Sequence, residues 1–416
     1  MLNISILTIG DEICIGQITN TNAVHISSEL TKIGANVLTH STIGDEKSIM
    51  LSEIDRLLKI SDILILTGGL GPTHDDITKP VLCEYFDDHL IYREQTLENL
   101  RKRYAKLNIK MTDRNMRQAQ VPSKCTSLVN SAGAAPGMMF EKDGSYLFSV
   151  PGVPGEMRAI LKDHIIPFTK KMIAERNENI VLYKQLLTFG IFESSLADMI
   201  GDIDKLFDKG DSLAFLPSFR GVRLRIGVQG KSQADASKKL AVLEANIYDK
   251  VGDFIYGSGQ DSIPSAIGKI LTQRKQTLAI AESCTAGMLG KEITSVSGSS
   301  AYFSGGVLVY SNEIKEKILG VKHETLIDHG AVSEQTACEL AENVRTKFNA
   351  DYSLSITGIA GPGGGTDDKP VGTVWIGYSD KNETFATKYF FGGNREINRE
   401  RSVANALTLL YKKLRG

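Results

Sequence analysis

The sequence predicts an α/β protein with two large domains joined by a small α+β module. Apolar runs of strand length alternate with amphipathic stretches of helical length from Ile4 to about Pro167, and this alternation returns from about Ser262 to Gly416. Continuous apolar strands separated by helices are typical of a parallel sheet covered on both faces. The length of 416 residues also favours more than one domain.

The first domain is expected to span residues 1–170. Its predicted strands cover residues 4–9, 36–43, 62–66 and 147–150, and its predicted helices lie near residues 23–33 and 48–60.

Residues 171–258 are expected to form the small module. Its strands are predicted at residues 183–189 and 222–228, and its helices at 194–200 and 234–251. A segment this short is sufficient for one sheet and its covering helices.

The last domain is expected over residues 259–416. Its predicted strands cover residues 277–281, 307–310, 352–356 and 373–378. Ser333 is a favourable N-cap residue and Glu334 follows in the first turn, so a helix is predicted from there to about Phe348.

Composition excludes several classes of protein. Hydrophobic residues make up 42% of the chain, enough for a core in each domain, which excludes global disorder. Lys and Arg number 48 against 49 Asp and Glu, so net charge would not hold the protein to nucleic acid or to an anionic membrane. The chain shows neither a signal segment nor an apolar run of about 18 residues, so we expect a cytoplasmic protein without a membrane span.

The cysteines are odd in number and never form a C-x-x-C pair. They are Cys14, Cys83, Cys125, Cys284 and Cys338. Neither a disulfide framework nor a zinc site is therefore expected.

A glycine-rich loop follows the strand at residues 62–66. It contains three glycines and two adjacent aspartates: Gly68, Gly69, Gly71, Asp75 and Asp76. Backbone amides in such a loop, before a helix begins, can bind an anion. The aspartates would repel a bare phosphate, but a divalent cation, Mg²⁺ or a transition metal, can bridge carboxylates and a pyrophosphate. The alternative is a turn in which one aspartate caps the helix.

Acidic residues also follow three other predicted strands. Asp11 and Glu12 follow the first strand, Asp45 follows the second, and Glu156 lies shortly after residues 147–150. Ligands bind at the carboxyl ends of strands in open parallel sheets. We therefore expect these acids to converge with the glycine-rich loop.

Serines follow strands of the last domain without a suitable histidine. Its histidines, His323 and His329, do not favour a Ser-His-Asp triad. A lysine whose pKa is lowered by burial can instead take the proton of a serine, and Ser300 with Lys315 is a candidate pair. The alternative is that Ser300 caps a helix and Lys315 lies on a solvated helix face.

Two arginines open the last predicted helix. Arg395 and Arg399 are four residues apart, which places them on one face at its positive end. Two guanidinium groups beside free amides suit a phosphate monoester. The alternative is that they pair on the surface with Glu396 or Glu400.

Several segments of the first domain form a recognisable set. They are residues 10–13, 16–18 and 21–22, the loop 68–78, Asn115 with 118–119, Gly133 with 135–137, and 151–157. This set resembles the N-terminal domain of the CinA family of competence/damage-inducible proteins, which is similar to a molybdopterin-binding fold. The resemblance implies a metal-dependent ADP-ribose pyrophosphatase that releases AMP and ribose 5-phosphate. The implied ligand-binding residues are Gly68, Gly69, Gly71, Thr73, Asn22 and Glu156, and the candidate metal ligands are Asp11, Asp45, Asp75 and Asp76.

The last domain contains a second set of motifs, at residues 281–287, 298–303, 310–315, 329–333, 356–362 and 369–375. They resemble the CinA C-terminal domain, which implies a nicotinamide mononucleotide deamidase that forms nicotinate mononucleotide and ammonia without a cofactor. The resemblance implies Ser300 as nucleophile and Lys315 as base. It places Glu282, Ser283, Tyr310 and Thr357 around the pocket, Arg395 and Arg399 at the phosphate, and Gly358 and Gly361 at the substrate.

The middle module is similar to the KH-like module of the same family. Its segment at residues 219–222 has one glycine and lacks a Gly-x-x-Gly loop, so a nucleic acid partner is not expected. The family implies a homodimer. The leading hypothesis is a bifunctional hydrolase of pyridine-nucleotide turnover, and the alternative is a non-catalytic competence-accessory protein that binds a pterin or a nucleotide.

Overall fold

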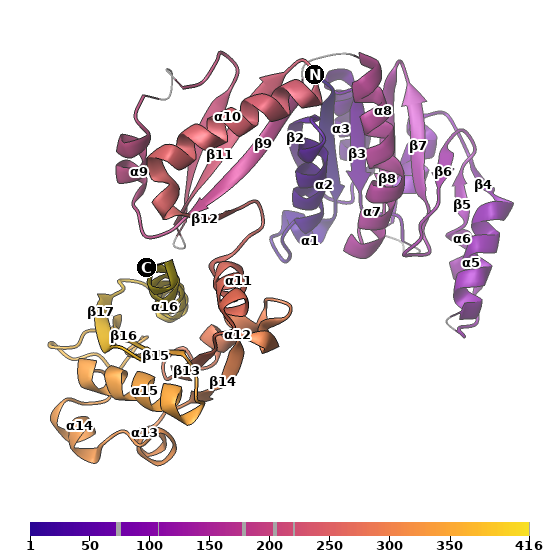
Figure 1. Cartoon of the computed structure of the whole chain (residues 1–416). Helices are drawn as coiled ribbons and strands as arrows, with labels where there is room; N and C mark the ends of the chain where they lie inside the picture. Colours follow the sequence, from indigo (N-terminus) through magenta and orange to yellow (C-terminus); the bar gives the residue numbers. More distant parts are fainter. Residues whose placement is uncertain (72–75, 107, 177–179, 203–205, 219–220, 416) are drawn as a thin grey trace. The chain divides into compact units, whose positions relative to one another are not determined.

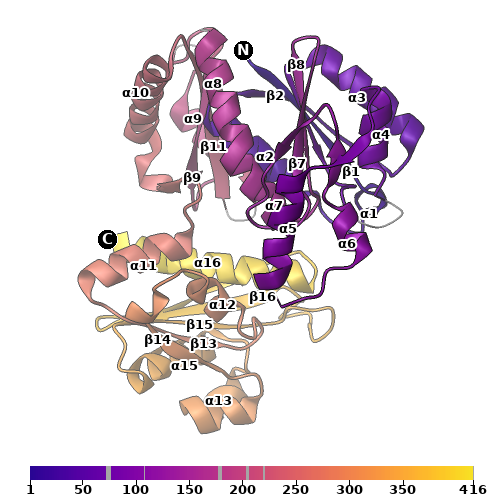
Figure 2. The same cartoon turned by 90° about the vertical axis from the view of Figure 1, so that its right-hand side faces the viewer.

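The computed structural model describes residues 1–71, 76–106, 108–176, 180–202, 206–218 and 221–415. It divides into two compact units (Figures 1 and 2). Unit 1 comprises Met1–Tyr183, Asp208–Ser212 and Gly227–Leu243; unit 2 comprises Lys184–Phe207, Leu213–Ile226 and Glu244–Gly416. No helix among the described residues is both long enough and apolar enough to cross a membrane.

Unit 1 contains a six-stranded sheet in the order β2-β1-β3-β8-β7-β6. Its strands are β1 (Asn3–Ile9), β2 (Asn36–Ile43), β3 (Ile63–Thr67), β6 (Thr126–Leu128), β7 (Gly137–Lys142) and β8 (Ser145–Val150). The first three strands and β8 pair in parallel, as expected from their apolar runs. The antiparallel strands β6 and β7, which the sequence had not indicated, extend one edge.

Helices cover both faces of this sheet. They are α2 (Thr21–Lys32), α3 (Lys47–Ile60), α4 (Thr78–Tyr85), α7 (Pro154–Ile160) and α8 (Ile166–Arg176), with a π-helical segment at Leu161–Ile165. Ile4 and Ile6 belong to the core beneath α2 and α7, whereas Leu7 and Ile9 belong to the core beneath α3 and α4. This division follows from side chains that alternate between the two faces of a strand.

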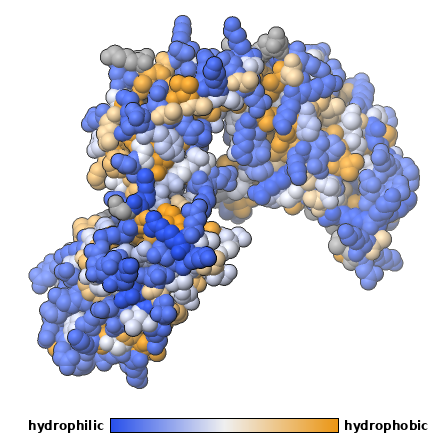
Figure 3. All heavy atoms as spheres, in the orientation of Figure 1, coloured by the Kyte–Doolittle hydropathy of each residue, from blue (hydrophilic) through white to orange (hydrophobic). Residues whose placement is uncertain are grey.

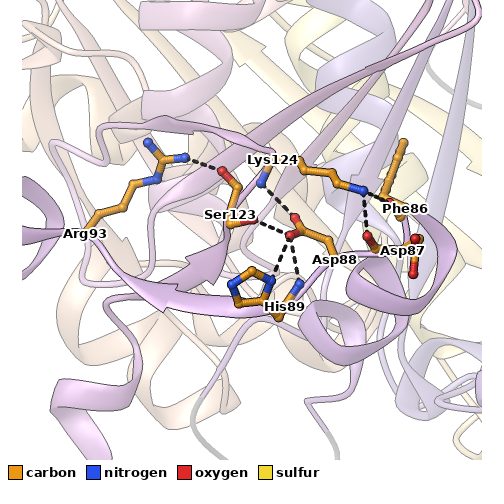
Figure 4. Close-up of polar contacts among 7 residues, drawn as sticks. All are labelled: Phe86, Asp87, Asp88, His89, Arg93, Ser123 and Lys124. Atoms are coloured by element: carbon orange, nitrogen blue, oxygen red, sulfur yellow. Dashed lines mark hydrogen bonds and ion pairs between the residues drawn. The ribbon is translucent and has the colours of Figure 1, made fainter.

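A small ribbon and two helices stand beside the sheet. The elements are β4 (Leu90–Tyr92), α5 (Glu94–Lys106), α6 (Asp113–Arg117) and β5 (Gln120–Pro122). The carboxylate of Asp88 ties β4 to the segment after β5, because it accepts hydrogen bonds from the Ser123 hydroxyl and from the amides of Lys124 and His89 (Figure 4). Burial raises the pKa of Asp88, but these hydrogen bonds outweigh burial and hold the pKa below its usual value.

The middle module is an α+β unit as predicted, but its sheet has four strands, two more than the sequence had indicated. The strand order is β10-β11-β9-β12, and the boundary between the two units passes through it. The elements are β9 (Ile180–Thr188), α9 (Glu193–Ile200), β10 (Ser212–Ser218), β11 (Gly221–Gly230), α10 (Gln233–Val251) and β12 (Ile255–Ser258), with a 3₁₀ turn at Gly252–Phe254. Residues 219–220, part of the segment compared with the Gly-x-x-Gly loop, lie outside the described residues.

Unit 2 contains a five-stranded sheet in the order β14-β13-β15-β16-β17. Its strands are β13 (Leu278–Glu282), β14 (Phe303–Leu308), β15 (Tyr352–Gly358), β16 (Thr373–Ser379) and β17 (Thr384–Phe390). Strand β13 pairs in parallel with β14 and β15, and the remaining two strands are antiparallel. The strand predicted at residues 307–310 is β14, and it begins earlier than predicted, at Phe303. Its first half contains two glycines, Gly305 and Gly306, and still pairs in parallel with β13.

Helices also cover both faces of the second sheet. They are α11 (Ile263–Arg274), α12 (Met288–Thr294), α13 (Asn312–Leu319), α14 (His323–Asp328), α15 (Glu334–Lys347) and α16 (Arg395–Arg415), with a 3₁₀ turn at Ser299–Ala301. One core packs β13 and β15 against α11, α12 and α16, and a second core packs β13 against α13, α14 and α15. Ser333 caps α15 as predicted, since its hydroxyl accepts a hydrogen bond from the Thr336 amide at 3.2 Å.

Gly68 lies where the first sheet meets its loop, and no other residue type suits the position. Its φ is +116°, and an added Cβ would lie 2.2 Å from the Ile9 carbonyl oxygen. We expect Gly68→Ala to lower the free energy of unfolding by about 2–4 kcal/mol, measured by urea denaturation. The control is Gly155→Ala in α7, where an added Cβ meets no atom within 4 Å and should change stability by less than about 1 kcal/mol. Equal effects of the two substitutions would contradict this account.

Candidate functional site

Strand β13 and helix α13 bring a lysine to a serine at one end of the second sheet. Ser283 directly follows β13, and its amide donates to the Ile356 carbonyl of the neighbouring strand at 2.9 Å. Helix α13 begins at the Ser311 cap, which accepts a hydrogen bond from the Ile314 amide. Lys315 lies in the first turns of that helix, and its Nζ donates to Ser283 Oγ at 3.3 Å and to the Tyr310 carbonyl at 3.2 Å.

Burial changes the chemistry of this lysine. The side chain of Lys315 is 1% exposed, so the ammonium form loses its hydration. Burial therefore lowers the pKa of Lys315, with Cys284 acting weakly in the opposite direction. A lowered pKa increases the neutral fraction of the amine, which is the form that can accept a proton from Ser283.

Ser300 lies away from this pair, contrary to the pairing expected from the sequence. It is exposed in the 3₁₀ turn before β14, beside the amino end of β13, because the Leu278 amide donates to the Tyr302 carbonyl. Lys315 follows the carboxyl end of β14. The length of the intervening strand is on the order of 20 Å. The serine that accompanies Lys315 in the structure is Ser283.

Glu282 organises the turn that carries Ser283. Its carboxylate is buried and accepts hydrogen bonds from the amides of Gly287, Leu289 and Gly290 at 2.9–3.1 Å. These amides belong to the start of α12, so the carboxylate acts as a cap from the strand end. The structure thus shows Glu282, expected around the pocket, holding the turn after Ser283 in place through these three hydrogen bonds.

Tyr310 and the two arginines flank the pair. Arg395 donates to the Tyr310 hydroxyl at 3.3 Å and to the Gly361 carbonyl at 2.8 Å. Arg399 donates to the Thr285 carbonyl, two residues beyond Ser283, at 2.7 Å. The first turns of α16 therefore place both positive charges next to the serine turn.

Other residues expected in this pocket support the backbone. Thr357 is buried and its hydroxyl donates to the Ala331 carbonyl at 2.7 Å. An added Cβ at Gly358 would lie 2.8 Å from the Thr373 carbonyl oxygen, so this glycine permits close strand packing. Gly361, with φ of +92°, contributes its carbonyl oxygen to Arg395.

The first domain has a cavity at the carboxyl ends of β1, β3 and β8. It measures about 490 Å³ and is lined by Gly68, Gly69, Gly71, Asn22 and Pro151, among others. Its described charged lining residues are all acidic: Glu12, Asp45, Asp76 and Glu156. Of the acids expected to converge with the glycine loop, Glu12, Asp45 and Glu156 line this cavity, whereas Asp11 is not among its lining residues.

The described acids do not form a metal site. Asp11 and Asp45 each accept a hydrogen bond from the other's amide at 3.2 Å, and Asp76 accepts one from the Gly71 amide at 2.7 Å. In the part of the chain that the structure describes, no three His, Cys, Asp or Glu side chains gather as metal ligands would. Thr73 and Asp75 lie outside the described residues.

Asn22 and Glu156 are held in the walls of this cavity. Asn22 Nδ2 donates to Thr67 Oγ1 and to the Gly152 carbonyl, which fixes the orientation of its amide. Glu156 accepts a hydrogen bond from Asn130 Nδ2 at 2.6 Å. Both residues therefore connect strand ends and loops around the cavity.

Lys79 was not expected from the sequence. Its Nζ donates to the carbonyls of Gln118 and Gln120, so it fastens the cavity-lining segment at Gln118 to α4. Burial lowers the pKa of Lys79 to about 8. Its position directly after Thr78, on the apolar face of α4, is the sequence signal that would have identified a buried lysine.

Three family models match successive parts of this chain. A family model described as "Probable molybdopterin binding domain" matches residues 5–171, "Damage-inducible protein CinA KH domain" matches 183–257, and "CinA C-terminal domain" matches 260–414. A "Putative competence-damage inducible protein" of Halothermothrix orenii is 38% identical over 99% of this chain and 98% of its own length. The chain belongs to the CinA family.

Two further proteins are similar to this chain. A "CinA-like protein" of Salinibacter ruber is 40% identical over 97% of each chain. A crystal structure of a CinA superfamily protein from Klebsiella pneumoniae is 33% identical, covers 37% of this chain and 96% of its own, and has a TM-score of 0.36. The CinA assignment confirms the resemblance seen in both sets of sequence motifs and the molybdopterin-binding-like fold of the first domain.

Proposed function

We propose that the C-terminal domain is an amidohydrolase that deamidates nicotinamide mononucleotide, with Ser283 as nucleophile and Lys315 as base. The observation that carries the proposal is the buried Lys315 amine at 3.3 Å from Ser283 Oγ. A serine paired with a neutral lysine is a sufficient nucleophile for acyl transfer. The nicotinamide substrate comes from the family resemblance described above.

The reaction balances with these two side chains and water. Ser283 Oγ attacks the carboxamide carbon while its proton passes to Lys315 Nζ. The tetrahedral intermediate then breaks its carbon–nitrogen bond, and Lys315 returns the proton to the departing ammonia. Water attacks the resulting ester, Lys315 accepts a proton from that water, and Ser283 leaves reprotonated with release of nicotinate mononucleotide.

The surrounding groups suit the charges of this reaction. Among the described residues, no backbone acceptor takes a hydrogen bond from the amide of Thr285, so this amide is a candidate donor to the developing oxyanion. The guanidinium groups of Arg395 and Arg399 supply positive charge for the 5′-phosphate. The rim at residues 361–365 is the candidate lid over the ester intermediate.

Substitution of the two serines separates this proposal from the pairing expected from the sequence. Ser283→Ala should lower ammonia release from nicotinamide mononucleotide by at least about 10³-fold, because no other hydroxyl contacts Lys315 Nζ in the described structure. Ser300→Ala should retain activity within about twofold. Loss of activity in Ser300→Ala with full activity in Ser283→Ala would contradict the proposed nucleophile.

The pH profile tests the lysine. Because burial lowers the pKa of Lys315 from 10.5, kcat/KM for deamidation should rise with pH through that lowered pKa and level off below pH 10.5. Lys315→Arg should lose activity, since a guanidinium does not release its proton. Lys317→Met is the control, because Lys317 is exposed and pairs with Glu313 on the same helix. A rate that is flat across the basic range would exclude Lys315 as the base.

A second function is supported for the N-terminal domain, hydrolysis of ADP-ribose to AMP and ribose 5-phosphate. The supporting observation is the cavity of about 490 Å³ where the glycine loop and the acids converge. The carboxylates of Glu12, Asp45, Asp76 and Glu156 line this cavity, and a carboxylate there would take a proton from an attacking water. The described acids do not fit a three-ligand metal site, so the metal requirement implied by the resemblance enters no step here.

Release of AMP from ADP-ribose tests this second function in the full chain. We expect AMP above the no-enzyme background in both wild type and Ser283→Ala, because the glycine-loop cavity and the serine turn belong to different domains. Chromatography of AMP with added Mg²⁺ or with a chelator decides the metal requirement. Binding of ADP-ribose without AMP release would support the alternative of a non-catalytic nucleotide-binding protein.

A further inference from the structure

A second cavity in unit 1 is lined by basic and hydroxyl-bearing residues. It measures about 650 Å³ and lies between one face of α5, β6 and the segment at residues 129–136. Its charged lining residues are Arg93, Arg103 and Lys124, and the described lining contains no aspartate or glutamate. Figure 3 shows the predominantly hydrophilic surface of this part of the molecule.

Three polar residues on one face of α5 line this cavity. Thr96, Asn99 and Arg103 recur at intervals of three and four residues, so they share one face of the helix. Leu97 and Leu100 hold the helix in place because they pack in a small core with Ala119. The polar face of α5 is thus fixed relative to the cavity.

Two of the three basic side chains, those of Arg93 and Lys124, donate hydrogen bonds to backbone carbonyls. Arg93 donates to the Ser123 carbonyl, and Lys124 Nζ donates to the carbonyls of Phe86 and Asp87 (Figure 4). Arg93 also donates to the Cys125 carbonyl. Arg103 is half-buried, and within the described part of the chain it makes no ion pair. Its guanidinium therefore keeps its donors for a ligand.

Three carboxylates accept hydrogen bonds from residues that line this cavity. Asp88 accepts hydrogen bonds from Ser123 and Lys124, Asp163 accepts one from Ser131, and Glu156 accepts one from Asn130. The hydroxyl or amide groups that bind them line the cavity, whereas the carboxylates are absent from its lining. The charged side chains that a ligand in this cavity would meet are therefore those of Arg93, Arg103 and Lys124.

The basic cavity adjoins the glycine-loop cavity. Ala134 lines both, and the described charged residues that line them are of opposite sign. An acidic cavity repels phosphate oxygens, whereas arginine, hydroxyl and amide donors attract them. We propose that the basic cavity binds a phosphate group of the small-molecule ligand of the N-terminal domain, with Arg103 as its main charged contact. The inference rests on the proposed ADP-ribose pyrophosphatase for the identity of that ligand.

The test compares two arginines of the same helix in the full chain. Arg103→Ala removes the cavity-facing guanidinium, whereas Arg101→Ala removes an exposed one that pairs with Glu94 and does not line the cavity. Isothermal titration calorimetry would measure binding of ADP-ribose, AMP and adenosine. We expect Arg103→Ala to weaken ADP-ribose and AMP binding about tenfold and to leave adenosine unchanged, because a charge-assisted hydrogen bond is lost only with phosphate. Arg101→Ala should match wild type for all three ligands.

The outcomes separate this inference from the proposed function. Equal binding of ADP-ribose and AMP to the two variants would overturn the phosphate site, whether or not the protein releases AMP. Equal weakening of adenosine and AMP in Arg103→Ala would also overturn it, since the effect would not depend on phosphate. The expected binding pattern without AMP release from wild type would support the phosphate site and contradict the pyrophosphatase.

Discussion

Parallel pairing of strands is the constraint on which both candidate sites depend. Parallel strands end at the same edge of a sheet, so residues that directly follow them meet even when they are far apart in the chain. In the second sheet, β13 and β14 carry Ser283 and the start of α13 to one edge. In the first sheet, β1, β3 and β8 bring three loops to a common cavity.

Burial lowers the pKa of two lysines, Lys315 and Lys79. The Lys315 amine is desolvated next to Ser283, which lowers its pKa and suits it to accept a proton. Lys79 is also buried, but its hydrogen bonds go to two backbone carbonyls, so it stabilises a cavity wall. Lys315 differs from Lys79 because one of its two hydrogen-bond partners is a side-chain hydroxyl, that of Ser283, while the other is the Tyr310 carbonyl.

The sequence was sufficient to predict the two α/β domains and the module between them, but it paired Lys315 with Ser300, whereas the structure places Lys315 beside Ser283. The predicted strand at 307–310 left out its glycine-containing start, where β-propensity is weak. Because β14 begins at Phe303, Ser300 precedes this strand and Lys315 follows it. The two residues therefore lie at opposite ends of β14. Ser283 was recognised as a pocket residue by resemblance, yet its contact with Lys315 is a long-range one.

The sequence by itself determined the alternation of elements, the glycine loop and the acids after the strands, because these depend on local pattern and residue type. Only the tertiary structure decided that Glu282 caps α12, that Arg395 reaches Tyr310, and that Asp11 and Asp45 engage each other's amides. Each of these contacts joins residues from separate segments. Their geometry depends on strand register and burial, which a single sequence does not specify.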